Sequence, residues 1–487
     1  MLKETADMST PESGGVFDAT PADHDDANNK ASQVPIVASG AFIKVAIATL
    51  GCKVNQYESA AMAECLTGAG YRLVDFHAAA DCYIINTCTV TNGADYQSRQ
   101  LIRRAQRLNP QAAIIVTGCY AQTTPHVFAG MPGVAVVVGT EEKHRMREII
   151  AAVREKFSEG MEASLAPEVQ VAPIDGYREA NIPPVSRFSG HTRAFLKIQD
   201  GCNAFCSYCI VPFARGRSRS IGAAEVIERI ENLARRGYRE VVLTGIHLGV
   251  YGEDRRDGST LAKVLRHVED YQLVERLRLS SLEPREISDE ILGIMSTARI
   301  VCPHLHIPLQ SGDDGILTKM GRNYDRIFFQ ALLEKAVSLR PDMTVGMDVM
   351  AGFPGEDMKA FENTINLVTS APIAYLHVFP YSRRSGTAAA RMGNQVREEE
   401  KKRRCLILRD LGTNKRRQHM EKFVGAVLPV LVEEREKRDG GRFQGLSHNY
   451  LSVVFKKGSA VMTNTIMPAK IAALANDHSL LGAPVHE

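Results

Sequence analysis

The residues best suited to chemistry are three cysteines, Cys202, Cys206 and Cys209, in the segment KIQDGCNAFCSYCIVPF. They follow the apolar run AFLKI with C-x3-C-x2-C spacing, and no nearby Cys or His has zinc-finger spacing. Zinc sites usually supply four ligands in paired arms. Three thiolates at this density suit an iron–sulfur cubane with one iron open to a small molecule. The alternative is three inert, buried thiols grouped by chance, and we favour the cluster.

A second set of cysteines shares one topological position. Cys52, Cys88 and Cys119 each stand just after a run that reads as a buried strand, and helical stretches separate those runs. Strands that alternate with helices predict a parallel α/β sheet, whose strand ends meet at one ligand-binding edge. We therefore expect a second cluster there, although each cysteine alone would fit a buried structural thiol. Core filling is expected for Cys65 and Cys82.

Composition sets the class of protein. The chain has 487 residues, of which 44% are hydrophobic and 24% charged, so a globular protein of about three domains is expected. No apolar run approaches a membrane span, and no signal peptide is visible, which predicts a cytoplasmic protein without a membrane partner. The net charge of +3 leaves nucleic-acid affinity to local basic patches.

The predicted organisation has five parts. Residues 1–41 read as a disordered leader, 42–154 as the N-terminal α/β domain, 155–190 as a linker, 191–420 as a β/α core, and 421–487 as a small β-barrel. The core contains six β/α units, short of the eight that close a TIM barrel, so a partial (β/α)6 barrel is expected. Its predicted strands are AFLKIQ, EVVLTG, RLRLSS, HLHIP, MTVGMDV and IAYLHVF.

Longer motifs carry a family resemblance. The segments TLGCKVNQYES, INTCTVTN, TGCYAQ, QDGCNAFCSYCIVPFARGRSRS, LTGIHLG, SSLEP, HIPLQSG, GFPGE and FPYSRRSGT resemble those of the radical S-adenosylmethionine (SAM) methylthiotransferases. That family joins an N-terminal methylthiotransferase domain, a radical-SAM core and a TRAM domain, and the likeness runs from about Phe42 to the end. The version around the three-cysteine loop is most similar to the branch acting on N6-threonylcarbamoyladenosine (t6A) in tRNA.

The resemblance implies two [4Fe-4S] clusters and SAM as cofactors. Cys202, Cys206 and Cys209 match the SAM-binding cluster, whereas the cysteines near the N-terminus match the auxiliary cluster. Tyr208 stands where the family carries an aromatic beside the adenine. The remaining candidates for SAM contacts lie after barrel strands and are Gly245, Ser281, Glu283, Gln310, Gly352 and Gly355.

These candidates have different expected roles. Gly245 would let the backbone approach the amino-acid part of SAM. Either Ser281 or Glu283 would face the ribose, although a surface-loop carboxylate is a close alternative. Gln310 belongs to a polar turn that resembles a cofactor-facing one, and the turn from Gly352 to Gly355 would complete the pocket, although most glycine-rich turns are plain loops.

The implied reaction is methylthio transfer to C2 of t6A at position 37, in the anticodon loop of tRNA. A sulfur source and an electron donor such as flavodoxin or ferredoxin would be partners. Alternative readings are a methylthiotransferase for isopentenyl-adenosine in tRNA or for a ribosomal-protein aspartate, and a non-catalytic iron–sulfur sensor that binds RNA.

Several surfaces have a composition that suits RNA. They are the arginine face at Arg99, Arg103, Arg104 and Arg107, the basic runs 401–404 and 415–417, and the aromatic residues Phe443, His448 and Tyr450 of the β-barrel. Solvated helix faces would explain the charged groups equally well.

Overall fold

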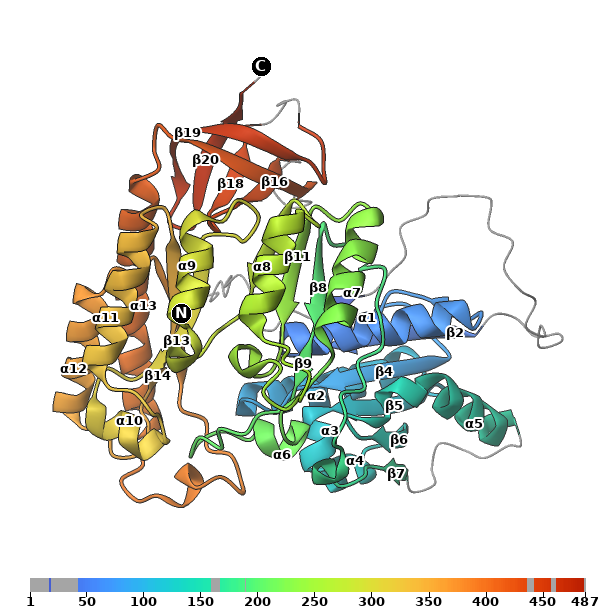
Figure 1. The fold of residues 1–487 in the computed structure, drawn as a ribbon. Coiled ribbons are helices and arrows are strands. Elements are labelled where there is room, and N and C mark those ends of the chain that lie inside the picture. Colours follow the sequence, from blue (N-terminus) through green and yellow to red (C-terminus); the bar gives the residue numbers. More distant parts are fainter. Residues whose placement is uncertain are drawn as a thin grey trace, which may run out of the picture. The chain divides into compact units, whose positions relative to one another are not determined.

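The computed structural model describes residues 17–18, 43–158, 167–188, 190–435, 442–456 and 461–485. Backbone contacts divide the chain into two compact units, Met1–Ile174 and Asp175–Glu487, which are described separately (Figure 1). Apart from Phe17–Asp18, the predicted leader lies outside the described residues. Within the part of the chain that the structure describes, no helix is both long and apolar enough to cross a membrane.

The first unit is built on a seven-stranded sheet of the predicted parallel type. Its order is β1-β2-β4-β5-β6-β7, with β3 paired to β2, and only β1 runs antiparallel to its neighbour. The two residues of β1 belong to the predicted leader and pair with β2. The strands are β1 (Phe17–Asp18), β2 (Lys44–Thr49), β3 (Arg72–Leu73), β4 (Cys82–Thr87), β5 (Ala113–Gly118), β6 (Val134–Val138) and β7 (Glu168–Gln170).

Alternating side chains of these strands pack against helices on both faces. Val45 and Ile47 join the core beneath helices α1 and α5, whereas Ala46 and Ala48 join the core beneath α2. This two-residue alternation is the geometry of a strand that is buried on both sides. The helices are α1 (Lys53–Gly68), α2 (Asn92–Leu108), α3 (Cys119–Thr123), α4 (His126–Ala129) and α5 (Met146–Ser158).

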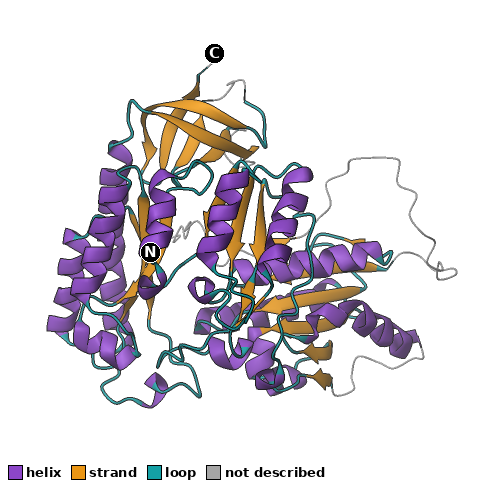
Figure 2. Ribbon diagram, in the orientation of Figure 1, coloured by secondary structure: helices purple, strands orange, loops and turns teal. Residues whose placement is uncertain are grey.

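The second unit contains the six predicted barrel strands. Hydrogen bonds divide them into two parallel three-stranded sheets, β12-β11-β8 and β13-β14-β15, with helices along their outer sides (Figure 2). A parallel bridge between Leu277 and Val301 leads from the first sheet toward the second. The strands are β8 (Arg193–Lys197), β11 (Glu240–Thr244), β12 (Arg276–Leu279), β13 (His304–Gln310), β14 (Thr344–Ala351) and β15 (Tyr375–Pro380).

Capped helices connect these strands. The side chains of Thr260, Ser288, Asp313, Asp325 and Asp357 each accept a hydrogen bond from the first turn of the helix that follows, which satisfies a backbone donor there. The helices are α6 (Val211–Arg215), α7 (Ala223–Arg235), α8 (Leu261–Tyr271), α9 (Asp289–Thr297), α10 (Asp314–Met320), α11 (Arg326–Leu339) and α12 (Met358–Ser370).

The chain ends in a long helix and a closed five-stranded β-barrel, as the sequence predicts. Helix α13 (Glu398–Glu421) packs along β14 and β15, and the barrel follows with the order β16-β17-β18-β20-β19. A small apolar core that includes Val430, Val453 and Phe455 fills the barrel. Its strands are β16 (Val427–Arg435), β17 (Phe443–Ser447), β18 (Ser452–Phe455), β19 (Ile466–Asn476) and β20 (Ser479–Pro484).

Candidate functional site

The three-cysteine loop follows the first barrel strand. The short strand β9 (Gln199–Asp200) pairs with β10 (Arg219–Ser220), and the loop between them carries Cys202, Cys206 and Cys209. The amide of Cys202 donates to the carbonyl of Gly216 at 2.9 Å, which closes the base of the loop. All three cysteines are partly exposed, so their sulfur atoms lie within reach of a bound group.

Buried polar side chains fix this loop. The amide nitrogen of Gln199 donates to the carbonyls of Asp200 and Gly201 and to the hydroxyl of Ser218, at 2.7–2.9 Å. The carboxylate of Asp200 accepts from Lys197 at 2.6 Å. Because buried hydrogen-bonded groups are costly to separate, the strand end holds the cysteine backbone in one conformation.

Two cation–carboxylate pairs contact the cysteine sulfurs. Nδ1 of His247 lies 3.3 Å from Sγ of Cys202, and its Nε2 pairs with Glu286. Burial lowers the pKa of His247, but its bonds to Cys202 and Glu286 outweigh burial and raise the pKa to about 10. On the other side, Nη1 of Arg322 donates to Sγ of Cys206 at 3.3 Å, while its other nitrogen pairs with Glu283.

This donor set fits an iron–sulfur cluster. Burial raises the pKa of the Cys209 thiol to about 12, so a metal is needed to keep its sulfur as a thiolate. The imidazole at Cys202 and the guanidinium at Cys206 offset the negative charge that thiolate ligands bring. Arg322 and His247 were not assigned a role from the sequence, because their contacts with the loop arise only in the fold.

Three of the predicted SAM-contacting residues lie in or beside the turn after β14. The ring of Tyr208 packs edge-on to Phe353, with ring centres 6.4 Å apart, and burial raises its pKa well above the ordinary value. Gly352 has φ +78°, and a Cβ atom there would lie 2.4 Å from the Lys401 side chain, so only glycine fits. Gly355 has φ +81° and lies near Lys319.

The other candidates are placed differently. Gln310 ends β13 with φ +64°. Its buried Oε1 has no hydrogen-bond partner within the described part of the chain, which is expected of an acceptor whose partner is a bound ligand. A Cβ atom at Gly245 would lie 2.8 Å from Oε1 of Gln199. Glu283 pairs with Arg322 and remains partly exposed, and Ser281 is exposed.

The first unit brings its three cysteines to neighbouring strand ends. Cys52, Cys88 and Cys119 follow β2, β4 and β5, which are adjacent and parallel. A Cβ atom at Gly51 would lie 2.8 Å from Cβ of Cys88, which shows how closely the first two turns approach. Cys88 and Cys119 are buried, whereas Cys52 is exposed.

A buried amide network holds this edge together. The amide nitrogen of Asn55 in α1 donates to the carbonyls of Leu50 at 2.7 Å and Thr87 at 3.1 Å, which join the turns before Cys52 and Cys88. The hydroxyl of Thr87 donates to the Thr117 carbonyl at 2.6 Å, which extends the network to the third turn. This arrangement can position three sulfur ligands around one group.

The remaining cysteines and arginines give a mixed outcome. Cys82 is buried as expected, but Cys65 is exposed, so its predicted role in the core is wrong. The guanidinium of Arg99 donates to the hydroxyl of Tyr120, next to Cys119, at 2.8 Å. The other three arginines of that helix face are exposed.

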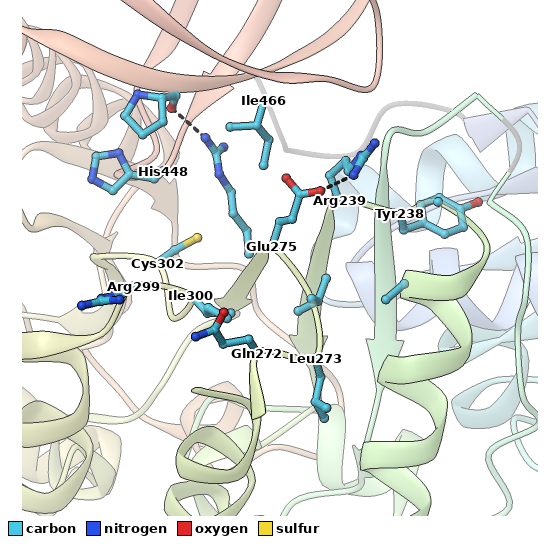
Figure 3. A pocket seen from close by; sticks show the side chains of 15 residues that line it. Tyr238, Arg239, Gln272, Leu273, Glu275, Arg299, Ile300, Cys302, His448 and Ile466 are labelled. Carbon is cyan, nitrogen blue, oxygen red and sulfur yellow. Dashed lines mark hydrogen bonds and ion pairs between the residues drawn. The ribbon is translucent and has the colours of Figure 1, made fainter. Parts of the chain in front are cut away.

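A cavity of about 540 Å³ lies elsewhere in the second unit (Figure 3). Arg239, Glu275 and Cys302 contribute to its wall, together with His448 and Ile466 of the β-barrel. Arg239 and Glu275 precede β11 and β12, so the cavity lies at the strand ends opposite the cysteine loop. Its position separates it from the residues expected to perform chemistry.

Two family models match the chain. The model described as "Uncharacterized protein family UPF0004" matches residues 44–139, and the model described as "Radical SAM superfamily" matches residues 196–368. The first range contains Cys52, Cys88 and Cys119, and the second contains the three-cysteine loop. Radical-SAM proteins use a [4Fe-4S] cluster and SAM.

Relatives match over most of their length. The "Threonylcarbamoyladenosine tRNA methylthiotransferase MtaB" of Bacillus subtilis is 43% identical, over 88% of this chain and 93% of its own. The "tRNA-2-methylthio-N(6)-dimethylallyladenosine synthase" of Clostridium novyi is 33% identical, over 90% and 95%. The solved radical SAM methyltransferase TsrM of Kitasatospora setae shares the fold, with a TM-score of 0.50, 16% identity, and coverage of 68% and 73%.

Proposed function

Because this chain belongs to the radical-SAM methylthiotransferase family, we propose that it converts t6A at position 37 of tRNA to 2-methylthio-t6A. The observation that carries the proposal is the 43% identity with a t6A methylthiotransferase over 93% of that relative. The relative named for dimethylallyladenosine is less similar, at 33% identity. The substrate is therefore a tRNA whose anticodon loop presents the modified base.

In this proposal Cys202, Cys206 and Cys209 hold the SAM-binding cluster. When bound there, the cluster and SAM would supply the reductive radical chemistry needed to activate the unreactive C2–H bond of adenine. The side chain of Gln310 and the ring of Tyr208 contribute the polar and apolar sides of the SAM pocket.

Cys52, Cys88 and Cys119 would hold an auxiliary cluster that provides the sulfur. Asn55 joins the strand ends before Cys52 and Cys88, and Cys52 is exposed. A sulfur source and a small electron carrier, such as flavodoxin or ferredoxin, would complete the set of partners.

Nucleoside mass spectrometry of tRNA tests this function. Cells without the gene should lose 2-methylthio-t6A and accumulate t6A, and the reconstituted protein should restore the product with SAM and a reductant. Loss of 2-methylthio-isopentenyl-adenosine instead would move the substrate to the other tRNA branch. Unchanged tRNA nucleosides, together with a lost methylthio-aspartate on a ribosomal protein, would refute a tRNA substrate.

A further inference from the structure

A row of polar side chains lines the inner face of the second barrel sheet. On β13, Leu305, Ile307 and Leu309 are fully buried apolar residues on one face, so His304 and His306 point to the other. Tyr450 of the β-barrel lies between this inner face and the first sheet. The Tyr450 ring stacks on His304 with ring centres 4.0 Å apart, and its centre lies 5.1 Å from the guanidinium of Arg278 on β12.

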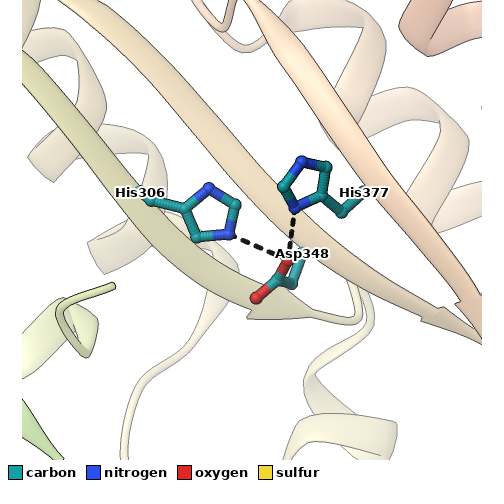
Figure 4. A group of neighbouring side chains, drawn as sticks. All are labelled: His306, Asp348 and His377. Atoms are coloured by element: carbon teal, nitrogen blue, oxygen red, sulfur yellow. Dashed lines mark hydrogen bonds and ion pairs between the residues drawn. The ribbon is translucent and has the colours of Figure 1, made fainter. Parts of the chain in front are cut away.

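Hydrogen bonds join this row into a chain. The Tyr375 hydroxyl lies 2.8 Å from Nε2 of His304 and 3.1 Å from Nδ1 of His306. Nε2 of His306 lies 2.8 Å from Oδ1 of Asp348, and Nδ1 of His377 lies 3.3 Å from the same oxygen (Figure 4). Three neighbouring strands, β13, β14 and β15, supply these side chains.

Exposure increases along the chain toward His377. The side chains of His306, Asp348 and His377 are 9%, 24% and 39% exposed. Within the described residues, Nε2 of His377 has no hydrogen-bond partner. This nitrogen is therefore the open end of the row of hydrogen-bonded side chains.

The position of this open nitrogen relative to the SAM-side residues matters. Asp348 lies on β14, four residues before Gly352 in the turn that follows the strand, which is a distance of roughly 13 Å for extended backbone. An adenine base that is bound with its C2 atom at the carboxyl ends of the barrel strands can therefore extend its modifying group toward His377. A charged or polar substituent suits this position, because an apolar one would cover Nε2 of His377 without giving it a hydrogen-bond partner.

We propose that His377 binds the carboxylate of the threonyl group of t6A, with Asp348, His306 and Tyr375 as positioning residues. This inference rests on the proposed function and assigns the residue that distinguishes t6A from isopentenyl-adenosine. The carboxylate is the charged group that the t6A modification adds to the base, whereas the isopentenyl group is neutral. A charge-assisted hydrogen bond to it would favour t6A.

The test compares two synthetic anticodon stem-loop RNAs that carry t6A or its threonine methyl ester at position 37. Equilibrium binding of the reconstituted holoenzyme without SAM should favour the acid by roughly ten- to a hundredfold. His377→Leu should lose this preference and bind both RNAs as the wild type binds the ester. His377→Gln is a second, polar variant, and His267→Leu, at an exposed position of α8, is the matched control that should keep the preference.

Each outcome has a defined meaning. An unchanged acid preference in both His377 variants overturns the inference, as does an equal loss of binding to both RNAs. Stoichiometric Zn²⁺ or Co²⁺ binding that depends on His377 also overturns it, because His306, Asp348 and His377 would then be metal ligands and not a carboxylate-binding group. Acid preference without any methylthio product would refute the proposed function and leave the binding site standing.

Discussion

Single side chains set the charge around the three-cysteine loop. The side chain of Arg322 is only 5% exposed and donates to Sγ of Cys206. A buried cation beside a cluster ligand stabilises the reduced cluster, which carries one more negative charge. Arg322 should therefore raise the reduction potential of the SAM-binding cluster, although it does not bind the iron.

Replacement of Arg322 by Gln should lower that potential by roughly 30–60 mV, a three- to tenfold change in the one-electron equilibrium. Arg322→Lys retains the charge and should shift the potential less. The measurement is a redox titration of the reconstituted protein followed by electron paramagnetic resonance. Arg326→Gln is the control, since this guanidinium lies at the surface with Asp314. Equal potentials for Arg322→Gln and the wild type would contradict the prediction.

The contrast between Cys206 and Arg322 shows what sequence can and cannot reveal about a site. Cysteine spacing within one loop is a local pattern, so the ligands are visible in the sequence. Arg322 lies 116 positions after Cys206, and their contact depends on the turn after α10 reaching the loop after β9. Such contacts between distant segments become visible only when the fold is known.

Helix α1 joins two of the strand ends in the first unit. Asn55 is 1% exposed, and its amide bridges the carbonyls that precede Cys52 and Cys88. Its loss would leave two buried carbonyls without this donor. We expect Asn55→Ala to loosen the predicted auxiliary cluster, so that iron falls from about eight toward about four atoms per chain after reconstitution. Iron analysis and the cluster absorbance measure this loss.

A matched control separates this effect from general destabilisation. Asn109 also donates its side-chain amide to a buried carbonyl, that of Ala80, at 2.9 Å, but it lies at the end of α2 away from the cysteines. Asn109→Ala should therefore lower the melting temperature without changing the iron content. Equal iron loss in both variants would show that Asn55 acts only through the stability of the unit.

Strand and helix periodicity in the sequence predicted which elements are present, but not how the strands pair or which side of a helix is buried. All six predicted barrel strands are present, because each is an apolar run followed by a turn and an amphipathic helix. The division into two hydrogen-bonded sheets was not predicted, since it depends on how far β12 and β13 separate. Cys65 was placed in the core from its position within a helix, although its side chain faces solvent.

The β/α core and the C-terminal β-barrel of the second unit share a buried charged junction. Arg276 donates to the carbonyls of Leu446 and Pro429, and Arg278 donates to those of His448 and Ser447. His448 and Tyr450, two candidates for stacking on bases, contact Asp342 and His304 at this junction. The β-barrel therefore depends on core arginines for its position.

Glu240 holds both arginines in place and is fully buried. Burial raises its pKa, but Arg278 and the neighbouring arginines outweigh burial and lower the pKa from 4.5 to about 2. The carboxylate thus contributes its full stability above about pH 4.5, and this contribution is lost as the pH falls toward 2.

Glu240→Gln should destabilise the second unit by about 3–5 kcal/mol at neutral pH, because it leaves buried guanidinium groups without their counter-charge. Urea unfolding followed from pH 7 to pH 3 measures this, and the difference between wild type and variant should shrink as the pH falls below about 4.5. Glu275→Gln is the control, since its pair with Arg239 is nearly half exposed and should contribute at most about 1 kcal/mol. A gap between wild type and Glu240→Gln that stays constant over this pH range would mean that the side chain acts through packing, and the charged junction would then not be what holds the β-barrel to the core.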